Sequence, residues 1–330
     1  FLGFASLMNS KLFKGNLHFQ ALGTNFRMWS DGIVSPMFEE LPSTCKLIAK
    51  EYDDAQGRLA LLNDPAFVDE FRHDWQHGRT GKGWASMKAK LGLPDHLVMR
   101  DLHRMVFDGA PVADWEGETL QQVYDRVERF QRGNSEQARS DSERAALELF
   151  PKPLGDDADF MLHMMRTYDK AFRFWVDVGN EGNRSTLELL LHKNTLPGFN
   201  DSGAHITNMA FFDANLMSLK LAQEQGLTTV SQIVRRLTSE PAEFFGLDVG
   251  TLAIGAQADI TMVNPEVLKT WDTDSSRKLE YRELFEHDQM VNRSDDVVTQ
   301  VMIRGESVWQ NNDFTQTLGA QPLGRILRAA

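Results

Sequence analysis

The segment Asn200–His205 reads Asn-Asp-Ser-Gly-Ala-His, and it follows the strand-like stretch Thr195–Asn200. A carboxylate just past a strand, before a turn of small residues, is typical of the carboxyl-terminal mouth of a parallel barrel. Gly203 and Ala204 allow backbone to approach a ligand closely. Asp201 can ligate a divalent metal and accept a proton from metal-bound water, whose pKa the metal lowers toward about 7. Because Asp-Ser-Gly is also ordinary turn chemistry, this hexapeptide needs support from elsewhere in the chain.

Composition narrows the class of protein. The 330 residues are 42% hydrophobic, which indicates a globular chain with one large domain and a smaller one. A net charge of −12 argues against a nucleic-acid or anionic-membrane partner. No apolar run approaches the roughly 20 residues of a membrane span. The single cysteine, Cys45, excludes an intrachain disulfide and fits a reducing, cytoplasmic location. We expect Cys45 to be a buried structural thiol rather than a bridging metal ligand.

The first half of the chain combines strand and helix patterns. Leu17–Trp29 is aromatic-rich and predicts a strand, and the chain from Pro42 to about Leu149 has a mostly helical pattern. Phe172, Phe174 and Val176 then alternate with other residues at strand periodicity. Such alternation of strands and helices predicts an α/β architecture.

In the second half of the chain, the sequence pattern changes from helical to β-rich after Gly246. Helices are expected at about Ala214–Gln225 and Thr229–Phe245, followed by two β-rich stretches, Gly250–Val263 and Val297–Trp309, around a charged and irregular Lys269–Asn292. We therefore expect a first domain over residues 1–246, with a long helical insertion at about 42–170. A small β-rich subdomain over 247–330 would follow.

Several sequence stretches occur in a diagnostic order. They are Asp201–His205, Leu237–Leu247 (LTSEPAEFFGL), Gly250–Ile260 (GTLAIGAQADI), Val298–Trp309 and the tail Phe314–Ala330. In this order they resemble the C-terminal portion of amidohydrolase-superfamily enzymes, in particular the D-aminoacylase and N-acyl-D-amino-acid deacylase branch. The upstream half resembles that branch more loosely.

The resemblance implies the C-terminal part of a (β/α)8 TIM-like metal-dependent hydrolase barrel, with a small β-sandwich subdomain built from both chain ends. It implies that Asp201 follows the last barrel strand, ligates zinc (one or two ions) and acts as general base and then acid. His205 and Asn180 would line the substrate pocket. One departure is Asn200, where the family usually has Ser. The implied activity is hydrolysis of a non-peptide amide C–N bond, with a small N-acyl amino acid or related amide as substrate.

The remaining metal ligands that the resemblance implies are not apparent. No His-x-His sequence occurs in the 330 residues, so we expect an N-terminally incomplete chain that is inactive by itself; its start at Phe1 also suggests missing upstream sequence. His73 and His77 are four apart on a predicted helix, a spacing that can hold a metal, but partly exposed helix histidines are the simpler interpretation. Two other functions stay open: a non-catalytic scaffold or inactive amidohydrolase-like protein, and an amidohydrolase that acts on a cyclic amide.

Overall fold

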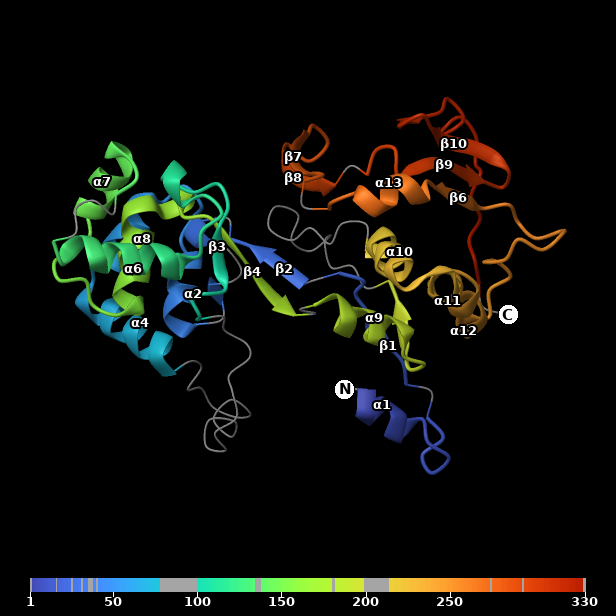
Figure 1. Cartoon of the computed structure of the whole chain (residues 1–330), viewed down its shortest axis with the longest axis horizontal. Helices are drawn as coiled ribbons and strands as arrows, with labels where there is room; N and C mark the ends of the chain where they lie inside the picture. The colour runs from blue at the N-terminus through green and yellow to red at the C-terminus, as the bar shows by residue number, and fades with distance from the viewer. Residues whose placement is uncertain are drawn as a thin grey trace. The chain divides into compact units, whose positions relative to one another are not determined.

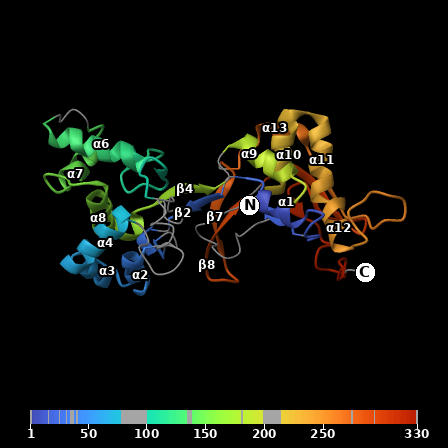
Figure 2. The ribbon, with the colours of Figure 1, turned by 90° about the horizontal axis from the view of Figure 1, so that it is seen from below.

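The computed structural model describes residues 2–15, 17–24, 26–30, 32–34, 38–39, 41–77, 100–133, 138–179, 182–198, 214–273, 275–292 and 294–328. The chain divides into two compact units. One unit is continuous, Arg27–Val178, and is called the helical unit below. The other joins Phe1–Phe26 to Gly179–Ala330 and is called the split unit (Figures 1 and 2).

Helices dominate the helical unit, with a three-stranded sheet ordered β2-β4-β3 beside them. The elements are β2 (Phe26–Trp29), η1 (Gly32–Val34), α2 (Pro42–Ile48), α3 (Ala55–Leu62), α4 (Pro65–His77), β3 (Met105–Phe107), η3 (Ala113–Trp115), α6 (Leu120–Gln131), α7 (Asp141–Glu148), α8 (Asp157–Tyr168), η5 (Asp169–Ala171) and β4 (Phe174–Gly179).

Side-chain caps explain where three of these helices begin. Thr119 and Gln122 form a capping box at the start of α6, and Ser140 and Asp156 cap α7 and α8 through the backbone N–H groups three residues on. Each cap satisfies an N–H group that the first helical turn leaves without a partner. Helices α6 and α8 meet through the rings of Tyr124 and Phe160, whose centroids lie 5.7 Å apart.

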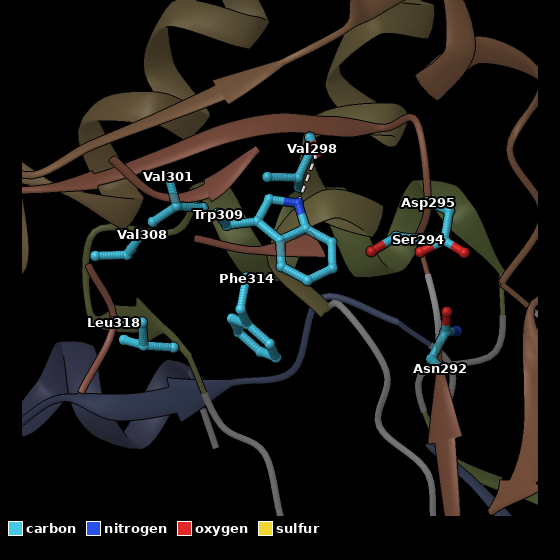
Figure 3. Close-up of a pocket in the computed structure, with 9 residues that line it drawn as sticks. All are labelled: Asn292, Ser294, Asp295, Val298, Val301, Val308, Trp309, Phe314 and Leu318. Atoms are coloured by element: carbon cyan, nitrogen blue, oxygen red, sulfur yellow. Dashed lines mark hydrogen bonds between the residues drawn. The ribbon is translucent and has the colours of Figure 1, made fainter. Parts of the chain in front are cut away.

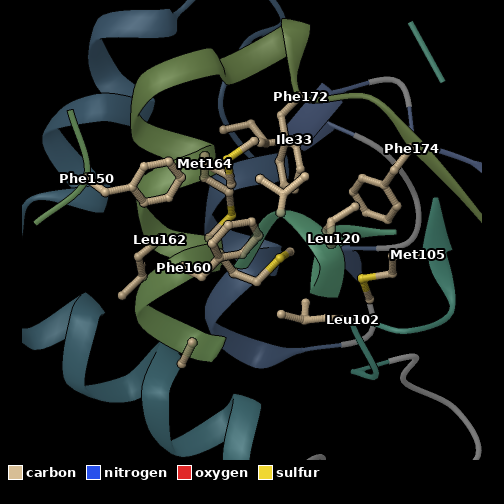
Figure 4. Close-up of a cluster of buried hydrophobic side chains, with 14 of the residues drawn as sticks. Ile33, Leu102, Met105, Leu120, Phe150, Phe160, Leu162, Met164, Phe172 and Phe174 are labelled. Atoms are coloured by element: carbon tan, nitrogen blue, oxygen red, sulfur yellow. The ribbon is translucent and has the colours of Figure 1, made fainter. Parts of the chain in front are cut away.

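One contiguous apolar core fills the helical unit. Figure 4 shows Phe150 and Phe160 packed together on one side, and their rings are stacked 5.6 Å apart. Phe172, Phe174 and Val176 are buried, which confirms the strand periodicity predicted there. The alternation buries one face of β4 against the helices.

The split unit holds the remaining elements, arranged around three small sheets. They are α1 (Leu2–Met8), β1 (Phe19–Ala21), α9 (Asn183–Leu191), β5 (Thr195–Pro197), α10 (Ala214–Gln225), α11 (Leu227–Leu237), α12 (Ser239–Phe245), β6 (Ile260–Val263), α13 (Pro265–Thr270), β7 (Arg277–Arg282), β8 (His287–Asn292), β9 (Val298–Ile303), β10 (Glu306–Gln310) and β11 (Asp313–Phe314). Strands β1 and β5 pair in parallel, β7 and β8 form an antiparallel pair, and a third sheet has the order β11-β10-β9-β6. No described helix is both long enough and apolar enough to cross a membrane.

Two secondary-structure predictions for the split unit were wrong. The predicted helix Thr229–Phe245 breaks at Thr238, because Pro241 has no N–H to continue the helix but fits the first turn of a new one. Lys269–Asn292, expected to be irregular, contains the antiparallel pair β7-β8. Charged side chains alternate too weakly with apolar ones there to give a strand pattern, and the cross-strand pairing itself stabilises the strands.

Strand Leu17–Trp29 was also predicted too long, since β1 and β2 are separate and belong to different sheets. The mixed α/β class is confirmed. Within the described residues β1 and β5 are the parallel pair, and the barrel and the sandwich stay predictions. The insertion predicted at about 42–170 falls inside the helical unit, and the boundary predicted near Leu247 falls inside the split unit.

Candidate active site

The three residues predicted to form the site lie just beyond described elements. Asp201 and His205 fall between β5 and α10, and Asn180 directly follows β4, so all three lie outside the described residues. The structure does describe the elements on both sides of the Asp201 segment. These elements show how its two ends are held.

Parallel pairing holds the first end of the segment. Phe19 lies opposite Thr195 and Ala21 opposite Pro197, and the Gly198 N–H continues the ladder to the Ala21 carbonyl at 3.2 Å. The carboxyl ends of β1 and β5 therefore lie side by side, and Asp201 follows three residues after Gly198. The carboxyl end of a parallel sheet is where barrel enzymes carry their reacting groups.

Close packing holds the second end of the segment, where α10 begins at Ala214. A Cβ atom placed on Gly23, two residues after β1, would lie 2.4 Å from the Ala214 carbonyl oxygen and 2.1 Å from the Ser218 hydroxyl. Only glycine fits at this distance, because any side chain would push α10 away. Both ends of the segment that contains Asp201 are thus anchored at the carboxyl end of β1.

A buried arginine holds the start of β5 through hydrogen bonds. Arg236, on α11, donates from Nε to the Leu190 carbonyl at 2.7 Å and from Nη2 to the His192 carbonyl at 2.9 Å. The same Nη2 reaches the Thr195 carbonyl, and the Thr195 hydroxyl at 2.9 Å. Nη1 pairs with Glu240 at 2.6 Å. One side chain thus joins the end of α9, the start of β5 and the start of α12.

Sequence reasoning did not identify Arg236 as part of this scaffold. The sequence feature that could have identified Arg236 is its position three residues after Ile233, which is fully buried. Residues three apart share a helix face, so Arg236 is a charged group on an apolar face. A guanidinium in such a place needs several acceptors, because burying it unpaired is costly.

A second polar cluster lies on the outer face of the strands in the helical unit. Asp177 accepts hydrogen bonds from Arg27 at 2.8 and 3.1 Å, and its carbonyl accepts one from Arg104 at 2.9 Å. The Arg27 guanidinium also stacks 3.6 Å from the centroid of Trp175. Asp177 is therefore committed to an ion pair rather than to proton transfer. The cluster fixes the strand that runs toward Asn180.

The histidines of the helical unit behave as structural residues. His163 is buried, its ring lies 3.9 Å from that of Phe150, and burial, with a smaller contribution from the Arg166 charge, lowers its pKa to about 4. His73 and His77 stack on each other at 4.6 Å. Among the described residues, no group of three or more His, Cys, Asp or Glu side chains is placed to hold a metal ion. The described part of the chain does not by itself fit the implied zinc.

The prediction for Cys45 was wrong in one respect. The thiol is exposed and contacts the Glu39 carbonyl at 3.0 Å, because its position on the short helix α2 faces away from the core. His96 lies outside the described residues. His103 is exposed on the turn before β3.

Comparison with known proteins supports the resemblance at the level of the superfamily. Residues 192–308 match the sequence model of the amidohydrolase family. That range begins at the end of α9, contains Asp201 and His205, and continues through α10–α12 to β10. It therefore spans the anchored segment and most of the ordered motifs.

The chain is also similar to individual proteins. Over 318 residues it is 27% identical to uncharacterized proteins of Mycobacterium tuberculosis and Mycobacterium bovis, covering 94% of this chain and 45% of each relative. The chain thus spans about half the length of these curated relatives. Shorter matches reach the dihydroorotases of Syntrophus aciditrophicus (45% over 60 residues, 18% of this chain and 13% of that enzyme) and Pelobacter propionicus (51% over 49 residues, 15% and 11%). No solved structure matches the chain significantly.

The family-model match and the short dihydroorotase matches agree on similarity to the amidohydrolase superfamily. Members of this superfamily are generally metal-dependent. The finer assignment to the D-aminoacylase branch stays a prediction.

Proposed function

We propose that this chain is part of a metal-dependent hydrolase of a non-peptide amide bond, of the N-acyl-D-amino-acid deacylase type. The observation that carries the proposal is the position of Asp201 in the sequence, four residues after strand β5, whose carboxyl end lies beside that of β1. The amidohydrolase match over residues 192–308 covers the same segment. A carboxylate at the carboxyl end of parallel strands is suited to metal binding and proton transfer.

Asp201 has two roles in this proposal. It would be one of the residues that hold zinc, and it would accept the proton of the attacking water and return it to the leaving amine. Zinc, when bound, lowers the pKa of its water toward about 7 and polarises the acyl carbonyl. The Asp201 carboxylate must point at the water with little freedom, because proton transfer needs hydrogen-bond distance. The Arg236 contacts to β5 and the tight approach of Gly23 to α10 would restrict it.

His205 and Asn180 are proposed as substrate-binding residues. Both carry side chains that hydrogen-bond to a carboxylate or an amide, as an N-acyl amino acid requires. Asn180 follows β4, a strand that the Asp177–Arg27 ion pair ties to β2.

A second candidate function is hydrolysis of a cyclic amide. The short matches to two dihydroorotases, 45% and 51% identical over 60 and 49 residues, favour it. Both reactions break a C–N bond by water attack, and so both would use Asp201 in the same way. Substrate preference separates them.

The test uses the complete gene product that contains this chain. It is assayed for amine release from a panel of N-acetyl-D-amino acids and from their L-enantiomers, and for ring opening of dihydroorotate. Turnover of the D-compounds alone supports the deacylase, and turnover of dihydroorotate alone supports the cyclic-amide hydrolase. No turnover of any amide by a folded product would favour the scaffold function instead.

Asp201→Asn provides the residue-level test. We expect kcat/KM to fall by about 10²–10⁴-fold with the thermal unfolding temperature unchanged, because Asn keeps the shape but cannot accept the proton. Asp53→Asn is the control, since the Asp53 side chain is 94% exposed and lies in the helical unit. Retention of more than about a tenth of the activity in Asp201→Asn would contradict the general-base role.

The metal assignment is tested on residues 1–330 alone. We propose that this chain is poor in zinc and inactive, because its sequence has no His-x-His and its described residues form no ligand group. Zinc is measured by mass spectrometry after dialysis. One zinc per chain together with turnover would refute this part of the proposal.

A further inference from the structure

The C-terminal sheet carries a pocket that the proposed hydrolysis does not use. Its volume is about 270 Å³, near the lower end of the roughly 300–1,000 Å³ typical of ligand sites. Its lining comes from the end of β8, the turn after it, strands β9, β10 and β11, and the turn after β11, all in the split unit: Asn292, Ser294, Asp295, Val298, Val301, Val308, Trp309, Phe314 and Leu318.

The pocket has an apolar side and a polar side. Figure 3 shows Val301, Val308, Leu318 and the two aromatic rings on one side, and Asn292, Ser294 and Asp295 on the other. The rings of Trp309 and Phe314 meet edge to face at 5.0 Å. The Trp309 Nε1–H is already used, since it donates to the Val298 carbonyl at 3.2 Å. Trp309 therefore offers an indole face rather than a hydrogen-bond donor.

The polar side offers acceptors and no described cation. The Asn292 amide nitrogen donates to the Thr273 carbonyl at 3.0 Å and to its hydroxyl at 2.7 Å. This pair sets the amide orientation, because the carbonyl must face a donor. The Asn292 Oδ1 atom is then buried without a hydrogen-bond partner in the described structure. Buried polar atoms without partners are uncommon and call for an explanation.

The turn that presents Asp295 is held in place. The Val297 N–H donates to the Ser294 carbonyl at 3.2 Å, and Val297 is fully buried. Asp296 exchanges two hydrogen bonds with Asn312, at 2.7 and 2.9 Å. Asp295 is thus the charged residue of the described lining. It lies on a turn in which both of its neighbours, Ser294 and Asp296, make hydrogen bonds.

We propose that this pocket binds a small organic ammonium compound with an aromatic or branched aliphatic body. The cation would donate to Asn292 Oδ1 and pair with Asp295, while the body packs against Trp309 and Phe314. Aromatic faces attract cations through their quadrupole, and charge-assisted hydrogen bonds are the stronger kind. The chain's net charge of −12 also favours a cation over an anion.

The test compares three ligands of similar size on the purified chain. They are 2-phenylethylamine, the neutral 2-phenylethanol and the anionic 3-phenylpropanoate, titrated by calorimetry at low and high salt. We expect saturable binding of the amine, at least about fivefold weaker binding of the alcohol, and none of the carboxylate. Added salt should weaken the amine alone, because screening acts on the charge.

Variants connect the binding to the pocket. Asp295→Asn should weaken amine binding about fivefold, and Phe314→Ala about threefold. Both side chains are exposed, so neither change threatens folding. Glu306→Gln makes the same charge change on β10 outside the lining and should leave binding unaltered. The proposal is overturned by equal affinity for the three ligands, by unchanged binding in Asp295→Asn, or by no saturation at the solubility limit of the amine.

Discussion

The two units of the molecule differ in how they bury their apolar side chains. The helical unit has one continuous core that joins its helices to its sheet (Figure 4). The split unit has smaller clusters, one around Ala21, Leu190, Ala222 and Ile233, and another around Leu216, Leu268, Trp271 and Val297. Of the described large apolar side chains that are exposed, Tyr52, Leu59 and Leu149 belong to the helical unit and all the others to the split unit.

This contrast suggests that the large core stabilises the helical unit, whereas the candidate sites lie in the split unit. Apolar burial stabilises a fold by about 25 cal/mol per Å², so a single continuous core makes the helical unit the more self-sufficient of the two. The split unit contains the anchored segment with Asp201 and the pocket near Trp309. Its elements depend more on individual polar contacts, such as those of Arg236, than on a large core.

The largest effect on stability is expected from the core of the helical unit. Phe160→Ala removes a fully buried ring and should destabilise this unit by about 3–5 kcal/mol, the range for buried Phe→Ala. Leu149→Ala, at a side chain that is 62% exposed, should change stability by less than about 0.5 kcal/mol. Urea unfolding followed by tryptophan fluorescence measures both. Similar losses in the two variants would show that the core is not the source of stability.

A smaller loss is expected from the arginine that anchors β5. Arg236→Met leaves several buried carbonyls and Glu240 without their donor, and should cost about 3 kcal/mol. Arg235→Met is the matched control, because the adjacent side chain is 66% exposed and its nearest carboxylate lies 4.0 Å away. Hydrogen exchange should speed up at Thr195–Pro197 in Arg236→Met only. Unchanged exchange there would mean that β5 does not need Arg236.

The smallest effect concerns His163 and pH. Its pKa in the folded protein is about 4, against about 6.5 when unfolded, so the unfolded state binds more protons between these values. Stability therefore falls as the pH is lowered from about 6.5 to about 4, by about 2–3 kcal/mol from this residue. His163→Gln should flatten that part of the pH profile, whereas His103→Gln, at an exposed site, should not. An identical slope in wild type and His163→Gln would contradict the assignment.

Sequence reasoning succeeded where the signal is local. The alternation of Phe172, Phe174 and Val176 predicted a strand where β4 lies, and the bounds predicted for Ala214–Gln225 were those of α10. Reasoning failed where the local pattern does not show which face of an element is buried. The β7-β8 pair carries charges on both strands, and the exposure of Cys45 depends on which face of α2 meets the core.

By itself, then, the sequence determined helix α10, the alternation before Asn180 and the ordered motifs that resemble amidohydrolases. These depend on spacings of a few residues, which the period of a helix or strand makes readable. Tertiary structure decided that β5 pairs with β1, across Phe19 and Thr195, and that Arg236 ties β5 to α9. Such contacts join residues far apart along the chain, and no local periodicity encodes which distant strand or carbonyl will be the partner.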